Sequence, residues 1–141
     1  MAPHRIRHHC DLNLVLKVLL DASILLAPFQ LNINFEEWIM KLYGGQIEFY
    51  ILENTLEELR RLSSRETSVG KYAKTVLSYS SKFKVLPKIS YEGDEALVKA
   101  ALRYGMAVAT CDQALRKRLI KLKIPVFSIQ GNIMRVDGLR C

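Results

Sequence analysis

Acidic residues that flank apolar runs are the side chains in this sequence best suited to chemistry. They are Asp21 after "KVLL", Glu57 and Glu58 after "IEFYIL", Asp94 and Glu95 before "MAVAT", and Asp112 after it. Carboxylates that converge on one spot raise each other's pKa unless a cation lies between them. Mg²⁺ prefers such oxygen ligands, keeps several waters and can assist hydrolysis of a phosphodiester. The pattern therefore predicts a hard divalent cation at a hydrolytic site.

Structural roles are the competing explanation at three of these positions. Asp94 and Asp112 stand where an acidic N-cap or first-turn residue stabilises a helix. Asp21 is harder to explain in this way, because the apolar segment "ILLAPF" follows it and makes a solvent-facing acid unexpected.

The two adjacent glutamates compete for one structural role. If Asn54 is the N-cap of the following helix, Glu57 completes a capping box and Glu58 is free for chemistry. If Thr55 is the N-cap, the two glutamates exchange these roles. The sequence leaves both possibilities open.

The elements that must position these acids alternate along the chain. Apolar and β-branched runs predict strands, and helical spacing with capping residues predicts helices. The strands are expected over 14–23, ending near Asp21, and over 47–52, 83–87, 106–110 and 125–129; the helices over 34–45, from 54 or 55 to 62, and over 68–82, 93–105 and 112–122. Such alternation predicts an α/β fold of three layers, with a central, mainly parallel sheet between helices. Ligands of such sheets bind beyond the carboxyl ends of the strands, where the acids fall.

Length and composition indicate a single domain spanning 1–141. The chain has 141 residues, of which 50% are hydrophobic, enough for one core, and we place that core at about 17–130. Residues 1–12 are expected to be a flexible basic tail. The segment after Gln130 is expected to be loosely ordered, unless "IMRV" forms an edge strand. No membrane-spanning run or signal peptide is recognised, so a cytoplasmic location is expected.

The charge balance favours a polyanionic partner. Twenty-one Lys and Arg residues face 14 Asp and Glu residues, for a net charge of +7. Nucleic acid is the first candidate for such a partner. Acids at the centre of a site with basic residues around it are typical of a nuclease, whose basic side chains hold phosphates.

Four motifs in this order resemble the PIN-domain family of small metal-dependent ribonucleases. They are "LLDAS", "TLEELRRL", "GDEALVKAAL" and "VATCDQALRKRL", and the resemblance covers roughly residues 17 to 130. The last motif is the most specific, and it is most similar to archaeal-type stand-alone members. The family includes VapC-type toxins of toxin–antitoxin pairs and rRNA-processing nucleases.

The resemblance implies roles for individual residues. Asp21, Asp94 and Asp112 would bind Mg²⁺ or Mn²⁺, with Glu58 orienting the attacking water. Glu57 is an alternative to Glu58, and Glu95 is an alternative to Asp94. Ser23 and Thr110 would support the acids, and the implied RNA-backbone contacts are Arg60, Arg61, Arg116, Lys117, Arg118 and Lys121, each of which could instead belong to an ordinary solvated helix face.

The sequence also departs from the family pattern. Asp-Ala-Ser stands at 21–23 in place of Asp-Thr-Asn or Asp-Thr-Ser, Cys111 occupies a position where Asn is common, and Ala114 replaces an Asp that some relatives carry. We expect catalysis to survive because the acids are present, with weaker metal binding as the expected cost.

The implied activity is hydrolysis of single-stranded RNA to 5′-phosphate and 3′-hydroxyl ends. A VapC-like toxin with an antitoxin partner is the leading interpretation. An rRNA- or tRNA-processing nuclease and a non-catalytic RNA-binding scaffold are the alternatives. The resemblance also implies a homodimer.

Other candidate groups are given structural interpretations. Cys111 lacks a His and acid partner in any motif, so a nucleophilic thiol is not expected. The cluster of His4, His8, His9 and Cys10 matches no standard zinc spacing and is assigned to the tail. Trp38 and Tyr43 are expected in the core or at an interface.

Overall fold

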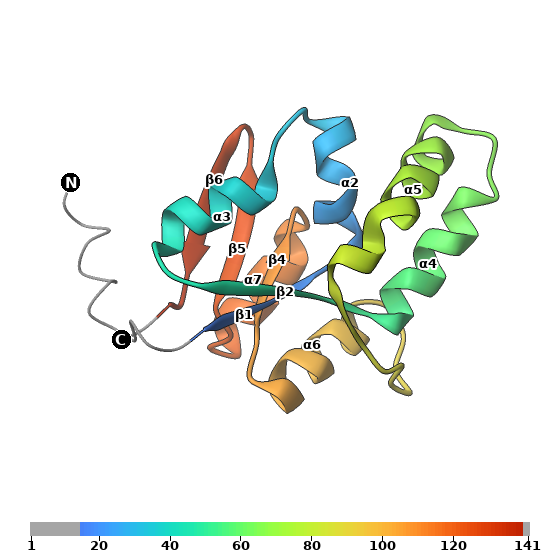
Figure 1. The fold of residues 1–141 in the computed structure, drawn as a ribbon. Coiled ribbons are helices and arrows are strands. Elements are labelled where there is room, and N and C mark those ends of the chain that lie inside the picture. Colours follow the sequence, from blue (N-terminus) through green and yellow to red (C-terminus); the bar gives the residue numbers. More distant parts are fainter. Residues whose placement is uncertain (1–14, 140–141) are drawn as a thin grey trace.

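A six-stranded sheet forms the centre of the protein, seen here in a computed structural model that describes residues 15–139 (Figure 1). The strand order is β3-β2-β1-β4-β5-β6. The first five strands are parallel, and β6 pairs antiparallel with β5 at one edge. The strands are β1 (Leu16–Leu20), β2 (Ile47–Leu52), β3 (Lys84–Leu86), β4 (Ala107–Thr110), β5 (Val126–Gln130) and β6 (Ile133–Asp137). The predicted, mainly parallel sheet is confirmed.

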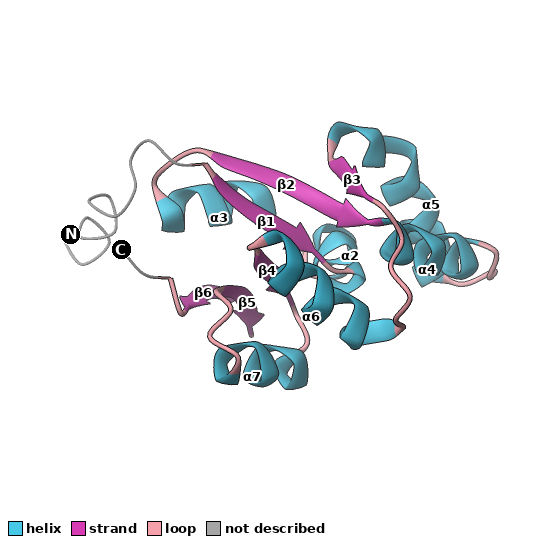
Figure 2. Ribbon diagram, turned by 90° about the horizontal axis from the view of Figure 1, so that it is seen from below, coloured by secondary structure: helices cyan, strands magenta, loops and turns pink. Residues whose placement is uncertain are grey.

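Helices cover both faces of the sheet, as the alternation predicts. One apolar cluster joins one face of the sheet to α2, α3, α4 and α5, and a second joins the other face to α6 and α7. Figure 1 shows α2 and α3 on the opposite side of the strands from α6, and Figure 2 shows α6 and α7 from below. The helices are α2 (Ala22–Gln30), α3 (Phe35–Tyr43), α4 (Glu53–Ser63), α5 (Ser68–Tyr79), the 3₁₀ turn η2 (Ser80–Lys82), α6 (Gly93–Tyr104) and α7 (Gln113–Lys121). The three-layer fold is thus confirmed.

Glycines end two of the helices. Gly44 and Gly105 are the C-caps of α3 and α6, with φ angles of 79° and 65°. This left-handed conformation costs glycine little because it has no Cβ atom. Both helices therefore stop sharply, and the chain turns back into β2 and β4.

Helix α2 is the one helix of the described residues that the sequence analysis missed. It begins directly after Asp21 and buries Ile24, Leu25 and Leu26. Because its apolar residues are consecutive, they show no helical period. Pro28, which lies inside the helix, also argues against a helix in sequence reasoning.

Three smaller expectations were wrong. Helix α4 begins at Glu53 with Leu52 as N-cap, so neither Asn54 nor Thr55 caps it and no capping box forms. The N-cap of α6 is Glu92 rather than Asp94, which lies in the first turn. Leu122 was expected as the last residue of the helix over 112–122, but it lies beyond α7 and is 42% exposed.

The segment after Gln130 is ordered as far as it is described, because "IMRV" lies within the edge strand β6. Trp38 and Tyr43 pack against the core, as expected. No described helix has both the length and the apolar character needed to cross a membrane. The cluster of His4, His8, His9 and Cys10 lies outside the described residues.

Candidate active site

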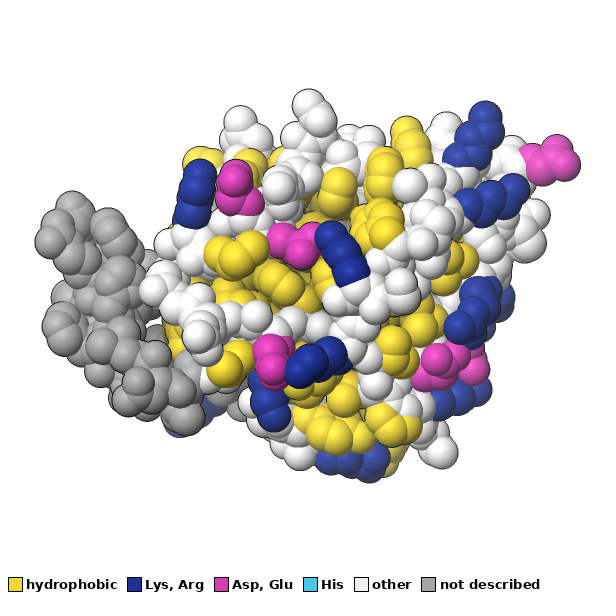
Figure 3. All heavy atoms as spheres, in the orientation of Figure 1, with side chains coloured by type: hydrophobic (Ala, Val, Ile, Leu, Met, Phe, Trp, Pro, Cys, Tyr) yellow, Lys and Arg dark blue, Asp and Glu magenta, His cyan; other side chains and the backbone are white. Residues whose placement is uncertain are grey.

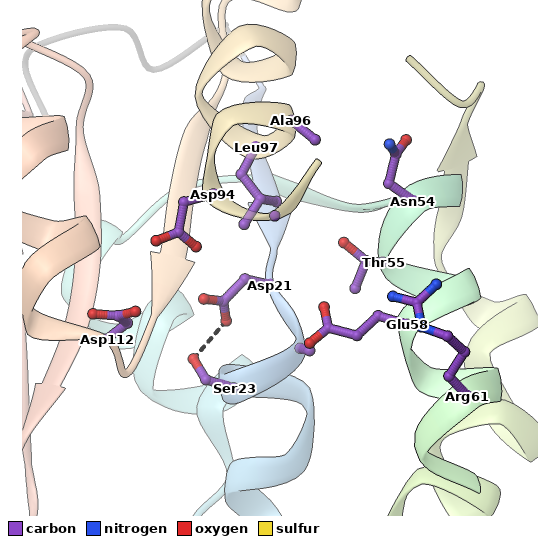
Figure 4. A pocket seen from close by; sticks show the side chains of 12 residues that line it. Asp21, Ser23, Asn54, Thr55, Glu58, Arg61, Asp94, Ala96, Leu97 and Asp112 are labelled. Atoms are coloured by element: carbon purple, nitrogen blue, oxygen red, sulfur yellow. Dashed lines mark hydrogen bonds between the residues drawn. The ribbon is translucent and has the colours of Figure 1, made fainter. Parts of the chain in front are cut away.

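A cavity of about 310 Å³ opens at the carboxyl ends of β1 and β4 (Figure 4). The chain leaves these neighbouring strands toward opposite faces of the sheet, through α2 and α7. Such a switch point is where open parallel sheets bind ligands. The cavity is lined by Asp21, Ala22, Ser23, Asn54, Thr55, Glu58, Arg61, Gly93, Asp94, Ala96, Leu97 and Asp112. The four acids implied as catalytic therefore meet in one place.

Asp21 is the buried acid of the cavity, with 6% of its surface exposed. Its backbone N–H donates to the carbonyl of Ala109, which fixes it beside β4. Its carboxylate accepts hydrogen bonds from the Ile24 N–H (2.9 Å), from Ser23 Oγ (2.7 Å) and from Thr110 Oγ1. Burial raises the pKa of Asp21 from 3.8 to about 6, although the three hydrogen bonds act in the opposite direction. Asp21 is also the N-cap of α2, so it has a structural role as well.

Ser23 and Thr110 hold this part of the site together, which is the supporting position implied for them. Besides donating to Asp21, Ser23 Oγ accepts from the Cys111 N–H at 2.8 Å. Thr110 Oγ1 accepts from the Asp112 N–H at 3.0 Å and is fully buried. The Thr110 hydroxyl thus bridges the two acids that follow neighbouring strands.

Asp112 and Asp94 line the side of the cavity that faces Glu58 and Arg61 (Figure 4), and both are exposed. Asp112 is the N-cap of α7, and its Oδ1 accepts from the N–H groups of Ala114 (2.8 Å) and Leu115 (3.2 Å). Asp94 lies in the first turn of α6. Partial burial, followed by the negative charge of Asp112, raises the pKa of Asp94. The charge of Asp112 therefore makes ionisation of Asp94 less favourable, as expected for convergent acids.

The alternatives Glu57/Glu58 and Asp94/Glu95 differ clearly in position. Glu58 points into the cavity, whereas Glu57 makes an ion pair with Lys88 at 3.0 Å in a neighbouring groove. Glu95 does not line the cavity but pairs with Arg118, which lowers the pKa of Glu95. Position thus favours Glu58 and Asp94 over their neighbours.

The six basic residues implied as RNA contacts divide into two groups. Three are engaged in ion pairs: Arg60 with Glu53 at 2.8 Å, Arg116 with Asp137 at 3.1 Å, and Arg118 with Glu95. Arg61, Lys117 and Lys121 form no ion pair with any described residue. In Figure 3, the coloured Lys and Arg side chains are scattered over the visible face rather than gathered into one patch.

Arg61 is the basic side chain among those described that lines the cavity. It extends from α4 on the same side as Glu58, as Figure 4 shows. A guanidinium at this position, without a carboxylate partner, is free to contact a phosphate.

Asn54 is the site residue whose role sequence reasoning missed, since we considered it only as a helix cap. Its side chain instead bonds the loop before α6: Nδ2 donates to the carbonyls of Ile89 and Tyr91, each at 2.9 Å, and Oδ1 accepts from the Ile89 N–H at 3.0 Å. No local signal predicts these contacts, because they join residues 35 and 37 positions apart.

Cys111 is not arranged for nucleophilic chemistry. Burial, followed by the negative charge of Asp21, raises the pKa of its thiol to about 11. The thiol therefore stays protonated at neutral pH, and a protonated thiol is a poor nucleophile.

The spacing of the carboxylates limits how a cation could bind in this cavity. Among the described residues, no three His, Cys, Asp or Glu side chains lie close enough together to hold a metal ion directly. Mg²⁺ usually binds one or two carboxylates directly and keeps several waters. Acids that lie too far away to bind the ion directly can still contact those waters. Burial raises the pKa values of Asp21 and Asp94, and a neighbouring carboxylate adds to each rise, so a nearby cation would favour the ionised form of both acids. The cavity therefore fits a hydrated hard cation better than a fully protein-bound one.

A family model that describes PIN-like domains matches residues 18–132. The chain belongs to the PIN-like domain family. This match confirms the resemblance drawn from the four motifs. PIN domains are generally nucleases, and the acid-lined cavity of this chain lies at the switch point of the matched region.

Solved structures agree with the fold of this PIN-like domain. The PIN domain endonuclease Utp24 is 23% identical, with a TM-score of 0.70, over 87% of this chain and 92% of that one. A domain of a functionally unknown protein from Methanocaldococcus jannaschii DSM 2661 is 14% identical, with a TM-score of 0.61, over 86% and 96% of the two chains. No curated protein matches the sequence significantly. At these identities the likeness concerns the fold.

Proposed function

We propose that this protein is a metal-dependent endoribonuclease that hydrolyses single-stranded RNA. The observation that carries the proposal is the meeting of four carboxylates at one cavity beyond the sheet. Asp21, Glu58, Asp94 and Asp112 come from four separate elements or junctions, yet all line that cavity. Membership of the PIN-like family supports the same conclusion, as does Arg61 at the rim, which forms no ion pair with any described residue.

Asp21, Asp94 and Asp112 are the residues proposed to hold Mg²⁺ or Mn²⁺, in part through water molecules bound to the ion. When bound, the cation supplies Lewis acidity at the phosphate and lowers the pKa of bound water. Asp21 is fixed by its three hydrogen bonds, so one carboxylate is already oriented before the ion arrives. The ion-binding form of Asp21 is the ionised one, and its raised pKa means that only about half of it is ionised at pH 6, with the ionised fraction rising above that pH.

Glu58 is proposed to orient the attacking water and to accept its proton. It is exposed and lies on the α4 side of the cavity, facing the aspartates (Figure 4). A general base must lie within hydrogen-bond reach of the water that it activates, and the open cavity allows this. Arg61 is proposed to contact a phosphate of the bound strand at the same rim.

The test of this proposal is cleavage of labelled single-stranded RNA with Mg²⁺ or Mn²⁺ and with excess EDTA. Wild-type protein should cleave only with metal, and Asp94→Asn should reduce the rate by at least about 100-fold. Glu95→Gln is the matched control, because Glu95 is the adjacent acid but lies outside the cavity. Equal rates for both variants would contradict the proposed site, and no metal-dependent cleavage by wild type would favour a non-catalytic RNA-binding scaffold.

Within this activity, a VapC-like toxin is our proposed biological role, and RNA processing is the alternative. The proposal rests on the motifs, and it requires an antitoxin partner. Expression of the wild-type gene should arrest growth, Asp94→Asn should not, and a small protein encoded beside the gene should relieve the arrest. Normal growth with accumulation of an RNA precursor in a deletion strain would favour processing. The proposed homodimer is checked by light scattering of the purified protein.

A further inference from the structure

A second cavity of about 200 Å³ adjoins the catalytic one. It is lined by Asn54, Glu57, Arg61, Lys88, Tyr91, Glu92 and Gly93. Asn54, Arg61 and Gly93 line both cavities, so the two spaces share a wall. A polymer whose scissile group lies among the acids therefore has an adjoining space for its next unit.

The lining of this second cavity matches the parts of a nucleotide. Tyr91 is 43% exposed, and Lys99 Nζ lies over its ring at 5.3 Å from the centroid, so a base would stack on the face that Lys99 does not cover. Aromatic rings of this kind stack on nucleobases without strong sequence preference. Arg61 stands at the shared wall, where the phosphate between two nucleotides would lie. Lys88 is partly neutralised by Glu57, so the main phosphate contact falls to Arg61.

Asn54 fixes the backbone of the loop at Tyr91 before any ligand binds. Its amide makes three hydrogen bonds to the backbone of the loop, including one to the carbonyl of Tyr91 itself. The loop is thereby tied to α4, which also carries Glu58 and Arg61. An aromatic residue whose backbone is already fixed loses less conformational entropy on binding than one on a mobile loop. Gly93, with φ of 56°, then turns the chain from this loop into α6 and toward Asp94.

We propose that this second cavity is a nucleotide subsite for the RNA unit next to the scissile phosphate. Tyr91 stacks on the base of that unit, Arg61 contacts the phosphate that joins it to the cleavage site, and Asn54 is a positioning residue for Tyr91. The inference rests on the proposed ribonuclease function and names the path that the strand takes away from the acids. That path runs over α4 and the 87–92 loop rather than over α7, two of whose cations are held in ion pairs.

The experiment measures binding of short single-stranded RNAs, each with one abasic position, to the full chain carrying Asp94→Asn. At one position, loss of the base should weaken binding by about 5-fold or more, the effect of one lost stacking contact. In the Tyr91→Ala background this penalty should disappear, and in Tyr91→Phe, which keeps the ring, it should persist. An abasic penalty that Tyr91→Ala leaves unchanged at every position would overturn the inference.

The phosphate contact is tested by the salt dependence of the same binding. Arg61→Gln should reduce the slope of log Kd against log salt by about 0.7, the value for one contact to a single strand. Arg103→Gln is the control, because Arg103 is an exposed arginine in the last turn of α6 that lines neither cavity, and its slope should equal that of the parent. Equal slopes for both variants would contradict the role of Arg61.

Cleavage of the same RNA by the wild-type chain separates this inference from the proposed function. If wild type cleaves with metal but Tyr91→Ala leaves the abasic penalty on binding unchanged at every position, only the subsite is refuted. If wild type does not cleave, the proposed function fails, and the binding data still show whether the subsite exists.

Discussion

Asp21 and Asp112 occupy equivalent places in two neighbouring strand-to-helix junctions but lie in opposite environments. Each follows a parallel strand, and each is the N-cap of the helix that comes next. Asp21 is 6% exposed, with a pKa raised by burial to about 6, whereas Asp112 is exposed to solvent. Two acids with the same local role therefore differ in what their charge costs the fold.

The difference in burial indicates which of the two ionised carboxylates lowers the stability of the fold. An ionised carboxylate in a buried position is unfavourable unless a cation or sufficient hydrogen bonds compensate. The exposed carboxylate of Asp112 loses little hydration on folding, and its capping role alone would explain an Asp at this position. Asp21 is the acid whose presence a capping role explains least, because Asn or Ser would cap α2 without a buried charge.

The largest expected effect comes from replacing each acid by its amide. Asp21→Asn and Asp112→Asn should both reduce metal-dependent cleavage by at least about 100-fold. Their stabilities should differ: in EDTA at neutral pH, Asp21→Asn should raise Tm by roughly 5 °C, since a buried charge is removed, and Asp112→Asn should leave Tm close to wild type. Calorimetry measures this contrast. A lower Tm for Asp21→Asn would show that the buried charge is compensated within the protein.

The next effect is the dependence of stability on pH in the absence of metal. Because the pKa of Asp21 is raised from 3.8 to about 6, the folded state keeps a proton in this range that the unfolded state releases. The free energy of unfolding should therefore fall as pH rises through this window. Between about pH 4.5 and 7.5, wild type should lose about 2 kcal/mol relative to Asp21→Asn.

Urea denaturation at the two pH values measures this difference. The comparison with Asp21→Asn cancels the contribution of Asp94, whose pKa is also raised, and that of Glu95, whose pKa is lowered. Asp112→Asn is the control and should keep most of the wild-type dependence. Parallel pH profiles for wild type and Asp21→Asn would contradict the assignment.

A smaller effect is expected from the hydroxyl that links the two acids. Thr110→Val removes the hydrogen bond donated to Asp21 and the acceptor for the Asp112 N–H, at a fully buried position. The unfolding free energy should fall by about 1.5 kcal/mol. Thr110→Ser keeps the hydroxyl and should lose clearly less. Equal losses in the two variants would assign the effect to the methyl group instead.

The smallest effect is expected at Cys111, which lies between Thr110 and Asp112. Its thiol pKa is raised to about 11, so Cys111→Ala should keep cleavage within about 2-fold of wild type. Peptide-level mass spectrometry after iodoacetamide treatment at neutral pH should show slow labelling of Cys111. Rapid labelling together with loss of cleavage would reopen a role for the thiol.

The sequence predicted those parts of the fold and site that depend on local pattern. Apolar runs located the strands, and the acids at their ends lie where a parallel sheet gathers them, which is why Asp21, Glu58, Asp94 and Asp112 line one cavity. The identification of the site residues as catalytic stays a prediction.

What the sequence did not reveal depends on tertiary contacts. Helix α2 is buried along consecutive residues, so it lacks the periodicity that identifies a surface helix. The ion pair between Arg118 and Glu95 joins two helices, and the bonds of Asn54 reach a loop distant in sequence. The choice between adjacent acids likewise depended on which one faces the cavity, and spacing alone could not settle it.

The bridge between Thr110 and Asp21 joins residues 89 positions apart. Strand β4, which supplies it, pairs with β1 only when most of the chain is present. During synthesis, Asp21, Glu58 and Asp94 leave the ribosome before Asp112, and the central pairing of the sheet cannot form until β4 has emerged. A nascent chain thus carries three of the four acids but no completed cavity, so the order of translation itself delays the appearance of the assembled site.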